Sequence, residues 1–410
     1  MKKRLRPILA LFVLGFAILA CSSSFTTVEG TPAPTSVQAD SPTAISITPE
    51  TPLPTPDPLD LPTQPSTAPN VSLPRSLYFL GYDGQSLKQV FRLERDGRTQ
   101  TQLTFEPVSV TNYDVSLVDG SLAFESGNQL ILVNADGSNR RVLADGARYP
   151  VFSPDGRTLA YSLNGLIFYD LSTGSSNVVL PDHPLGGSLP PELYIPDKYS
   201  PDGTKLLLKV GHPPDSPWTA AIYIPATNTL MQFAGNDPRL SCCVYYGGAN
   251  WSPDSSSLYT VATTPDSSTP FGELWKVDAN TGAVTTLIPG SAGDGNMMLM
   301  YLEYEPYLAP DGGLNFFSAK IPEATGHVNH VPMMIVRTKP EDITANWSIL
   351  RGDMFDLVNE ALWAPDGSFV IVVFAPTESQ ITGGRAEIAY FDGKPKTVSM
   401  NYAENMKWGP

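Results

Sequence analysis

Several carboxylates stand at one position relative to a repeated turn, and they are the side chains best suited to chemistry. Glu305 and Glu360 each lie four residues before an Ala-Pro-Asp-Gly turn, and Glu303 is close to the first. Asn405, next to Glu404, holds the corresponding place near the C-terminus. Carboxylates gathered at the same ends of neighbouring strands could hold a cation or the basic side chain of a peptide. The alternative is a charged rim that only keeps the protein soluble.

The sequence offers little for metal or covalent chemistry. His327 and His330 could supply two metal ligands from one loop, but a metal site needs further ligands and a second shell that fixes them. Nucleophile elbows, His-Glu-x-x-His helices, glycine-rich phosphate loops and Cys-x-x-Cys pairs are absent from the sequence. We therefore expect no metal, no cofactor and no catalytic residue.

The adjacent residues Cys242 and Cys243 allow two interpretations. Outside the cytoplasm, where disulfides persist, the two thiols could form a vicinal bridge. Adjacent Cα atoms lie about 3.8 Å apart, which is less than the usual disulfide span, so this bridge would be strained. Free structural thiols are the alternative.

A four-residue turn recurs along the chain, and an apolar stretch follows each copy. Residues 153–156, Ser-Pro-Asp-Gly, separate two apolar stretches, and proline, aspartate and glycine each favour a tight turn. Later copies begin at Ser200, Ser252, Ala309 and Ala364. Successive copies therefore start 47, 52, 57 and 55 residues apart, and aromatic residues precede four of the turns at Phe152, Tyr199, Trp251 and Trp363. Repeats of about this length, each with several short strands, are typical of propeller blades.

The turn, the aromatic residue before it and the apolar strand after it resemble the WD-like repeat of TolB-type β-propellers. The same repeat occurs in the propellers of prolyl oligopeptidase-like enzymes. The resemblance covers roughly residues 76–410. It implies the fold but says little about function, because propellers carry many unrelated functions.

The strand pattern predicts an all-β, seven-bladed β-propeller over residues 76–410. Residues 76–105 supply three strands of a first blade that lacks its innermost strand. Residues 405–410 supply an innermost strand without a blade, with Trp408 in the aromatic position. The C-terminal strand is therefore expected to pair into the first blade and close the ring.

Loop lengths distinguish the two faces of this fold. In an up-and-down blade, the first and third connections lie on one face, and the second and inter-blade connections lie on the other. The former are tight turns, whereas the latter include insertions at 211–219, 263–272, 321–331 and 375–385. Long loops often carry function, although solvated insertions are the alternative. On this long-loop face we expect partner contacts from Trp218, Tyr245, Tyr246, Glu303, Glu305, His327, His330, Glu360, Glu404 and Asn405.

Residues 1–20 have the pattern of a targeting segment. A basic stretch precedes an apolar run that is too short for an ordinary membrane span. The four residues that end at Cys21, Ile-Leu-Ala-Cys, resemble a bacterial lipobox, in which the cysteine receives a diacylglycerol and becomes the new N-terminus. The resemblance implies a lipoprotein attached to membrane lipid outside the cytoplasm, on the cell membrane or the outer membrane. A plain signal peptide and an uncleaved anchor are the alternatives.

Residues 21–75 are expected to link Cys21 to the propeller. Between residues 22 and 75, 12 of 54 residues are proline, 10 are threonine and 8 are serine. This composition buries too little apolar area to fold, so we expect a disordered, extended tether. It is expected to join the first strand on the side of the tight turns, which would point the long-loop face away from the lipid.

The expected function is binding. The formal net charge of −15 disfavours nucleic acid, whose phosphates need a basic surface. We expect a monomeric, extracytoplasmic scaffold that recognises a protein or peptide partner. The competing expectation is an enzyme at the channel mouth, such as a lyase, cyclase or hydrolase acting on a glycan or peptide, and a purely structural envelope protein is a third.

Overall fold

The computed structural model describes residues 63–65, 72–183, 192–211, 219–233, 245–263, 271–288, 297–300, 306–320, 332–343, 348–377, 380 and 382–410. For residues 63–65, 245–248, 262–263, 271–272, 297–300 and 319–320 it gives the backbone alone. The chain divides between Thr55 and Pro56, and every described residue belongs to the unit Pro56–Pro410.

Three antiparallel sheets of four strands follow one another along the chain. The first contains β5 (Val110–Val115), β6 (Leu122–Ser126), β7 (Gln129–Val133) and β8 (Arg141–Asp145). The second contains β9 (Arg148–Phe152), β10 (Thr158–Ser162), β11 (Gly165–Asp170) and β12 (Ser176–Pro181). The third contains β13 (Leu193–Tyr199), β14 (Leu206–Gly211), β15 (Thr219–Ile224) and β16 (Thr229–Gln232).

The next two groups of strands are joined by an extra strand. One group has β17 (Tyr245–Trp251), β18 (Ser257–Thr263), β19 (Phe271–Asp278) and β20 (Val284–Ile288). The other has β22 (Tyr307–Leu308), β23 (Leu314–Lys320), β24 (Met333–Thr338) and β25 (Ser348–Phe355). Between them, β21 (Met297–Met300) pairs with the start of β19 and with the end of β23. The connection between these groups is therefore itself part of a sheet, which the sequence did not predict.

The last strand of the chain pairs with strands from both ends of the fold. The group β26 (Val358–Trp363), β27 (Phe369–Phe374), β28 (Gly384–Tyr390) and β29 (Thr397–Trp408) continues into β2 (Leu77–Tyr82), β3 (Lys88–Leu93), β4 (Thr99–Gln102) and β1 (Thr63–Pro65). The first half of β29 pairs with β28. Its second half pairs with β2, with Glu404 opposite Leu80 and Trp408 opposite Leu77. The predicted pairing of the C-terminal segment with the first blade is thus present.

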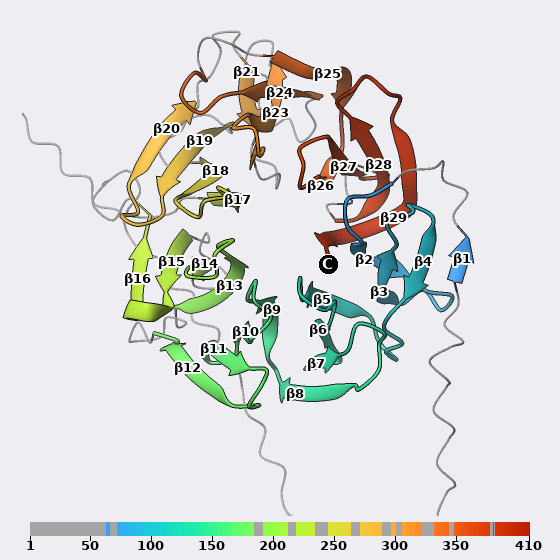
Figure 1. Cartoon of the computed structure of the whole chain (residues 1–410), viewed down its shortest axis with the longest axis vertical. Coiled ribbons are helices and arrows are strands. Elements are labelled where there is room, and N and C mark those ends of the chain that lie inside the picture. Colours follow the sequence, from blue (N-terminus) through green and yellow to red (C-terminus); the bar gives the residue numbers. More distant parts are fainter. Residues whose placement is uncertain are drawn as a thin grey trace, which may run out of the picture. The chain divides into compact units, whose positions relative to one another are not determined.

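Figure 1 shows these sheets in chain order around a common centre, with β5, β9, β13, β17 and β26 on the inside. Apart from one short 3-10 turn, the described residues form strands, turns and loops without an α-helix. This is the architecture of a β-propeller, and the all-β prediction is confirmed. No helix in the described part of the chain is long and apolar enough to cross a membrane.

The core lies between neighbouring sheets. Leu80 and Val90 pack with Tyr113 and Phe124 of the following sheet, for example. The aromatic residues that precede the turns are buried in such interfaces, at 7% exposure for Phe152, 8% for Tyr199, 7% for Trp251 and 5% for Trp363. Each of them packs against apolar residues of the preceding group of strands. Trp408 extends the pattern, because its indole Nε1 donates a hydrogen bond of 2.8 Å to the carbonyl oxygen of Trp363.

The repeated turn closes on its own side chains. The Ser153 hydroxyl donates to Asp155 Oδ1 at 2.6 Å and accepts a hydrogen bond from the N–H of Thr158 at 2.9 Å. In the third copy, the hydrogen bond from the Ser252 hydroxyl is the main reason that the pKa of Asp254 falls to about 2. Ser255 occupies the glycine position there with φ of 61°. The turn therefore tolerates serine where the other copies use glycine.

The folded unit begins slightly before residue 76. Leu73 is 1% exposed and packs against the β26–β29 and β2–β3 strands. Its N–H donates to the carbonyl oxygen of Arg95 at 2.8 Å. The last residues of the expected linker are therefore part of the packed fold.

Candidate functional site

Several innermost strands carry a β-bulge in their pairing with the next strand. Their pairing with the next strand shifts register between Val110 and Asn112 in β5, and between Val358 and Glu360 in β26. The strands β13 and β17 carry the same irregularity. Tyr149 in β9 and Asn405 in β29 have φ of 57° and 52°. A bulge redirects side chains and leaves backbone groups unpaired, so these positions require partners from elsewhere.

Glu360 supplies such a partner where β26 meets β29. Its half-buried carboxylate accepts hydrogen bonds from the N–H groups of Met406 and Asn405. Burial raises the pKa of Glu360 to about 7, and the nearby Glu404 carboxylate adds to the rise. Three of the residues predicted on the long-loop face, Glu360, Glu404 and Asn405, are therefore brought together.

A chain of hydrogen bonds leads from Asn405 to β9. The Asn405 side chain donates to Asn112 Oδ1 at 2.9 Å, and the Asn112 amide donates to Glu125 Oε1 at 3.2 Å. The same Glu125 oxygen accepts the N–H of Tyr149 at 2.6 Å. Because Tyr113 also donates its hydroxyl to the carbonyl oxygen of Asn405 at 2.7 Å, polar groups of three successive sheets are connected.

Glu404 belongs to a second polar group at the edge of the first blade. Its carboxylate pairs with Lys88 Nζ at 2.6 Å and accepts the Tyr402 hydroxyl at 2.5 Å. Burial raises the pKa of Tyr402, and the hydrogen bond to Glu404 raises it further. The Tyr402 ring lies 4.7 Å from the ring of Tyr82, measured between centroids. Tyr82 itself is half in solvent.

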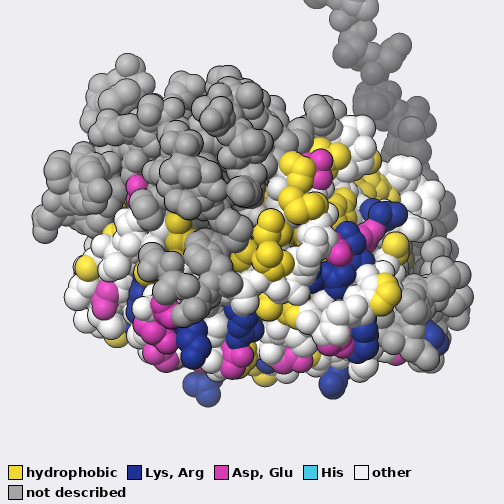
Figure 2. Space-filling model, turned by 90° about the horizontal axis from the view of Figure 1, so that it is seen from above, with side chains coloured by type: hydrophobic (Ala, Val, Ile, Leu, Met, Phe, Trp, Pro, Cys, Tyr) yellow, Lys and Arg dark blue, Asp and Glu magenta, His cyan; other side chains and the backbone are white. Residues whose placement is uncertain are grey.

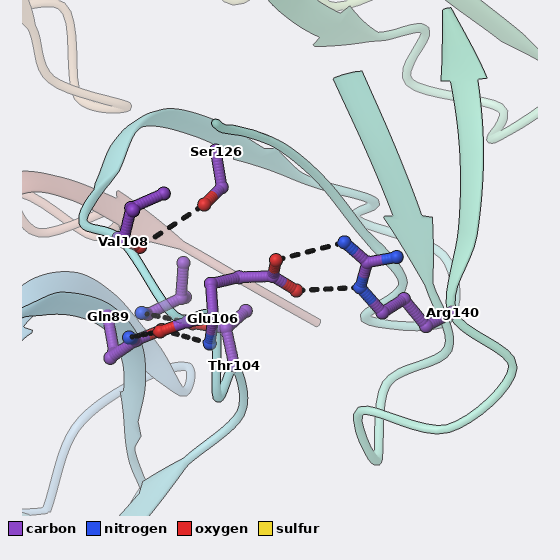
Figure 3. Close-up of polar contacts among 7 residues, drawn as sticks. Gln89, Thr104, Glu106, Val108, Ser126 and Arg140 are labelled. Atoms are coloured by element: carbon purple, nitrogen blue, oxygen red, sulfur yellow. Dashed lines mark hydrogen bonds and ion pairs between the residues drawn. The ribbon is translucent and has the colours of Figure 1, made fainter. Parts of the chain in front are cut away.

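A fixed loop connects β4 to β5, as Figure 3 shows. The side chain of Gln89 is fully buried, donates to the carbonyl oxygen of Glu106 at 2.8 Å and accepts the Thr104 hydroxyl at 2.8 Å. Arg140 holds the Glu106 carboxylate with two hydrogen bonds, of 2.7 and 2.9 Å. On the far side of the loop, the Ser126 hydroxyl donates to the carbonyl oxygen of Val108 at 3.2 Å. The loop is therefore held from both adjacent sheets.

Exposed apolar side chains lie on this loop and at the neighbouring long-loop ends of β2 and β9. We call Tyr82, Phe105, Val108 and Tyr149 the apolar patch, and their exposed fractions are 50%, 56%, 45% and 39%. Lys88, which lies opposite Tyr82, donates its N–H to the Ser109 hydroxyl, and the Ser126 hydroxyl donates to Val108. Glu125, next to Ser126, accepts the N–H of Tyr149, so the segments that carry the patch are connected. Phe105 also lines a cavity of about 230 Å³ whose other walls include Leu103, Phe124 and Arg140.

Other exposed apolar side chains occur on the outer wall. Ile349 and Met354 of β25 are 58% and 50% exposed. Figure 2 looks at the side on which β24 and β25 lie in Figure 1, and shows hydrophobic side chains with Lys, Arg, Asp and Glu close by. The apolar patch differs because it lies at the strand ends that the sequence assigns to the long-loop face.

The remaining predicted residues are placed only in part. Tyr245 and Tyr246 lie in β17, where their backbones pair with Thr263 and Ala262. Outside the described residues are Cys21, Trp218, Cys242, Cys243, Glu303, Glu305, His327 and His330. Within the described residues, no three His, Cys, Asp or Glu side chains come together as metal ligands would. Sequence reasoning missed Tyr82, Phe105 and Val108, because single apolar residues in short connections give no periodic signal.

Comparison with solved structures identifies the architecture. A structure from a study of two prolyl endopeptidases has a TM-score of 0.54 and 12% identity, over 84% of this chain and 50% of that chain. The oligogalacturonate lyase of Vibrio parahaemolyticus has a TM-score of 0.51 and 13% identity, over 83% of this chain and 92% of that chain. These likenesses show the fold alone. TolB from Acinetobacter baumannii also matches, with a TM-score of 0.39 and 15% identity over 79% of each chain.

The chain spans half the length of the prolyl endopeptidase chain that it matches. No protein-family profile and no curated protein matches the sequence.

Proposed function

We propose that this chain is a lipid-anchored, extracytoplasmic, seven-bladed β-propeller that binds a protein or peptide partner on its long-loop face. The apolar patch is the observation that carries this proposal. Tyr82 lies in β2, Phe105 and Val108 in the loop between β4 and β5, and Tyr149 in β9, and all four are 39% exposed or more. Aromatic side chains that remain in solvent together mark interaction surfaces, and tyrosine is frequent among the residues that dominate binding energy.

The loop beneath the patch supports binding because it is already ordered. Gln89 and Glu106 fix the loop through buried hydrogen bonds, so Phe105 and Val108 are presented on a rigid base. Binding to a preformed surface avoids the entropic cost of ordering a loop.

The polar groups at the inner strand ends support binding over acid–base catalysis. Glu360 accepts backbone N–H groups of β29, and Glu125 accepts the N–H of Tyr149 in the next sheet. Their carboxylates therefore have structural partners in positions where a catalytic acid or base would need access to substrate.

The seven-bladed closed form is part of the proposal. Hydrophobic clusters join each sheet to the next, and one cluster joins Ile371 and Ile388 to Leu77 and Leu93. Pairing of β29 with both β28 and β2 supports a ring in which the last strand completes the first blade.

A double substitution in the patch should abolish partner capture. We expect the Tyr82→Ser, Phe105→Ser variant to lose a protein that the wild type retains from a cell-envelope extract, because it removes two exposed aromatic contacts. The control is Leu117→Ser, Val118→Ser, two exposed residues, at 43% and 59%, in the turn between β5 and β6 on the opposite face. Quantitative mass spectrometry of the retained proteins measures the difference. A protein lost from the control but kept by the patch variant would place the binding face on the other side.

Lipid anchoring has a separate test. Cys21→Ser should move the protein from the membrane fraction to the soluble fraction, since acyl chains contribute about 0.8 kcal/mol per buried CH₂ and the variant cannot receive them. Immunoblotting of fractionated cells measures this, with Cys242→Ser as the matched cysteine control. Retention of the Cys21→Ser protein in the membrane would indicate an uncleaved anchor.

A further inference from the structure

A short piece of the expected linker occupies the outer edge of the first blade. β1 pairs antiparallel with β4, with Thr63 opposite Thr101, Gln64 opposite Gln100 and Pro65 opposite Thr99. An outermost strand leaves a row of backbone N–H and C=O groups unpaired, and such an edge accepts another extended segment. In this protein the segment comes from the chain itself, as Figure 1 shows at the edge of β4.

Within β1, Gln64 is the residue whose backbone groups face β4. Leu103 N–H donates to Val90, and the Thr99 carbonyl oxygen accepts from Glu94, so these groups of the β4 region face β3. Because successive backbone groups of a strand point to opposite sides, the N–H and C=O of Gln100 face outward. Gln64 lies directly opposite Gln100 and can both donate to it and accept from it.

Prolines at both ends of β1 keep the strand short but do not interrupt the pairing of Gln64 with Gln100. Pro65 lies opposite Thr99, whose carbonyl oxygen accepts the Glu94 N–H and whose own N–H donates to Asp96 Oδ1, so the missing N–H of Pro65 leaves neither group of Thr99 without a partner. The residue before Thr63 is Pro62, which has no N–H to extend the ladder. The sequence therefore favours one short strand in one register.

The direction of β1 determines where the tether leaves the fold. β2 begins on the face of the tight turns, so β3 runs back to that face and β4 runs from it to the long-loop face. β1 is antiparallel to β4 and therefore runs from the long-loop face to the turn face. We propose that Thr63–Pro65 is a docking strand that holds the edge of β4 and makes the N-terminal tether leave the propeller beside the long-loop face.

This reverses the expectation from the sequence, in which the tether joined β2 directly from the turn side. The docking strand stands independently of any partner. Its effect on partner binding rests on the proposed function. With β1 docked, the tether joins the propeller next to the partner-binding face. Release of β1 would move this junction to the opposite face.

Hydrogen–deuterium exchange tests the docking strand in the mature full-length protein. We expect the amide of Gln100 to exchange at least about tenfold faster in Gln64→Pro than in wild type. The variant loses the N–H that faces the Gln100 carbonyl, and the resulting release of β1 takes away the Gln64 carbonyl that accepts the Gln100 N–H. Gln64→Ala is the matched control and should exchange like wild type, since its backbone is unchanged. Equal exchange of Gln100 in wild type and Gln64→Pro would overturn the proposal.

Distances between spin labels test the direction of the tether. With the native cysteines replaced by serine, one label goes to Asp60→Cys, and the other to Gln85→Cys on the long-loop side or to Arg98→Cys on the turn side of the same blade. With Gln64 unchanged, we expect the label at residue 60 to lie closer to the label at residue 85 than to the label at residue 98. This difference should disappear when Gln64→Pro is added. A shorter distance to Arg98→Cys in wild type would overturn the proposal. Neither experiment involves a partner, so failure here is distinguishable from failure of the proposed function.

Discussion

We expect removal of residues 404–410 to abolish cooperative folding of the propeller at physiological temperature. The truncation leaves the pairing of residues 397–403 with β28 but removes the strand that pairs with β2. It also removes the buried side chain of Met406 and the Trp408 ring, which lies 6.2 Å from the ring of Phe369. The newly exposed edge of β2 would have no partner.

The expected loss is large because many contacts of different kinds end at this segment. The Trp408 indole bonds to Trp363, Lys407 Nζ pairs with Asp114 at 2.8 Å, and the Gly409 N–H donates to Ser76 at 2.9 Å. Burial of Met406 and part of Trp408 contributes about 3 kcal/mol, and the hydrogen bonds contribute about 1 kcal/mol each. A loss on the order of 5 kcal/mol is comparable to the whole stability of many domains.

Circular dichroism during urea and thermal unfolding measures this loss. The matched control removes only Pro410, which is exposed and lies beyond the last strand. It should unfold like the wild type. A truncated protein that unfolds cooperatively within a few degrees of the control would show that β29 contributes little to the fold.

The fold could be predicted from the sequence because its signals are local and repeated. The Ser-Pro-Asp-Gly turn needs only its own side chains, and the aromatic residue before it needs only an apolar neighbour. The unpaired strands at the two ends of the sequence indicated where β29 would pair. The strand β21 was missed because it pairs with two different groups of strands, and no local pattern encodes that arrangement.

The sequence predicted where the candidate site lies, but not the hydrogen bonds and burial of its side chains. The spacing before each turn found Glu360 and Asn405, which both lie at bulges, but it could not show that the Glu360 carboxylate binds the backbone of β29. Burial and partner geometry arise from strands that are far apart in sequence. The same is true of Phe105, whose exposure depends on how Gln89 and Arg140 hold the loop that carries it.

The stability of the protein should fall between pH 5 and pH 8 because of Glu360. Its pKa rises from 4.5 to about 7 on folding, chiefly because burial disfavours the charged carboxylate. The folded state therefore binds more protons than the unfolded state between these pH values, and protonation favours folding. The contribution of Glu360 is fully present below pH 4.5 and is lost as pH rises through about 7. A shift of this size corresponds to about 3 kcal/mol at most.

Two substitutions of Glu360 separate its charge from its hydrogen bonds. Glu360→Gln keeps an oxygen that can accept the Met406 N–H and carries no charge, so its stability should be at least that of wild type at pH 8 and nearly independent of pH through this group. Glu360→Ala leaves the N–H groups of β29 without an acceptor and should lose about 1–3 kcal/mol at both pH values. Urea unfolding of the three proteins at pH 5 and pH 8 provides the free energies. A difference between wild type and Glu360→Gln that is the same at both pH values would show that Glu360 does not titrate in this range.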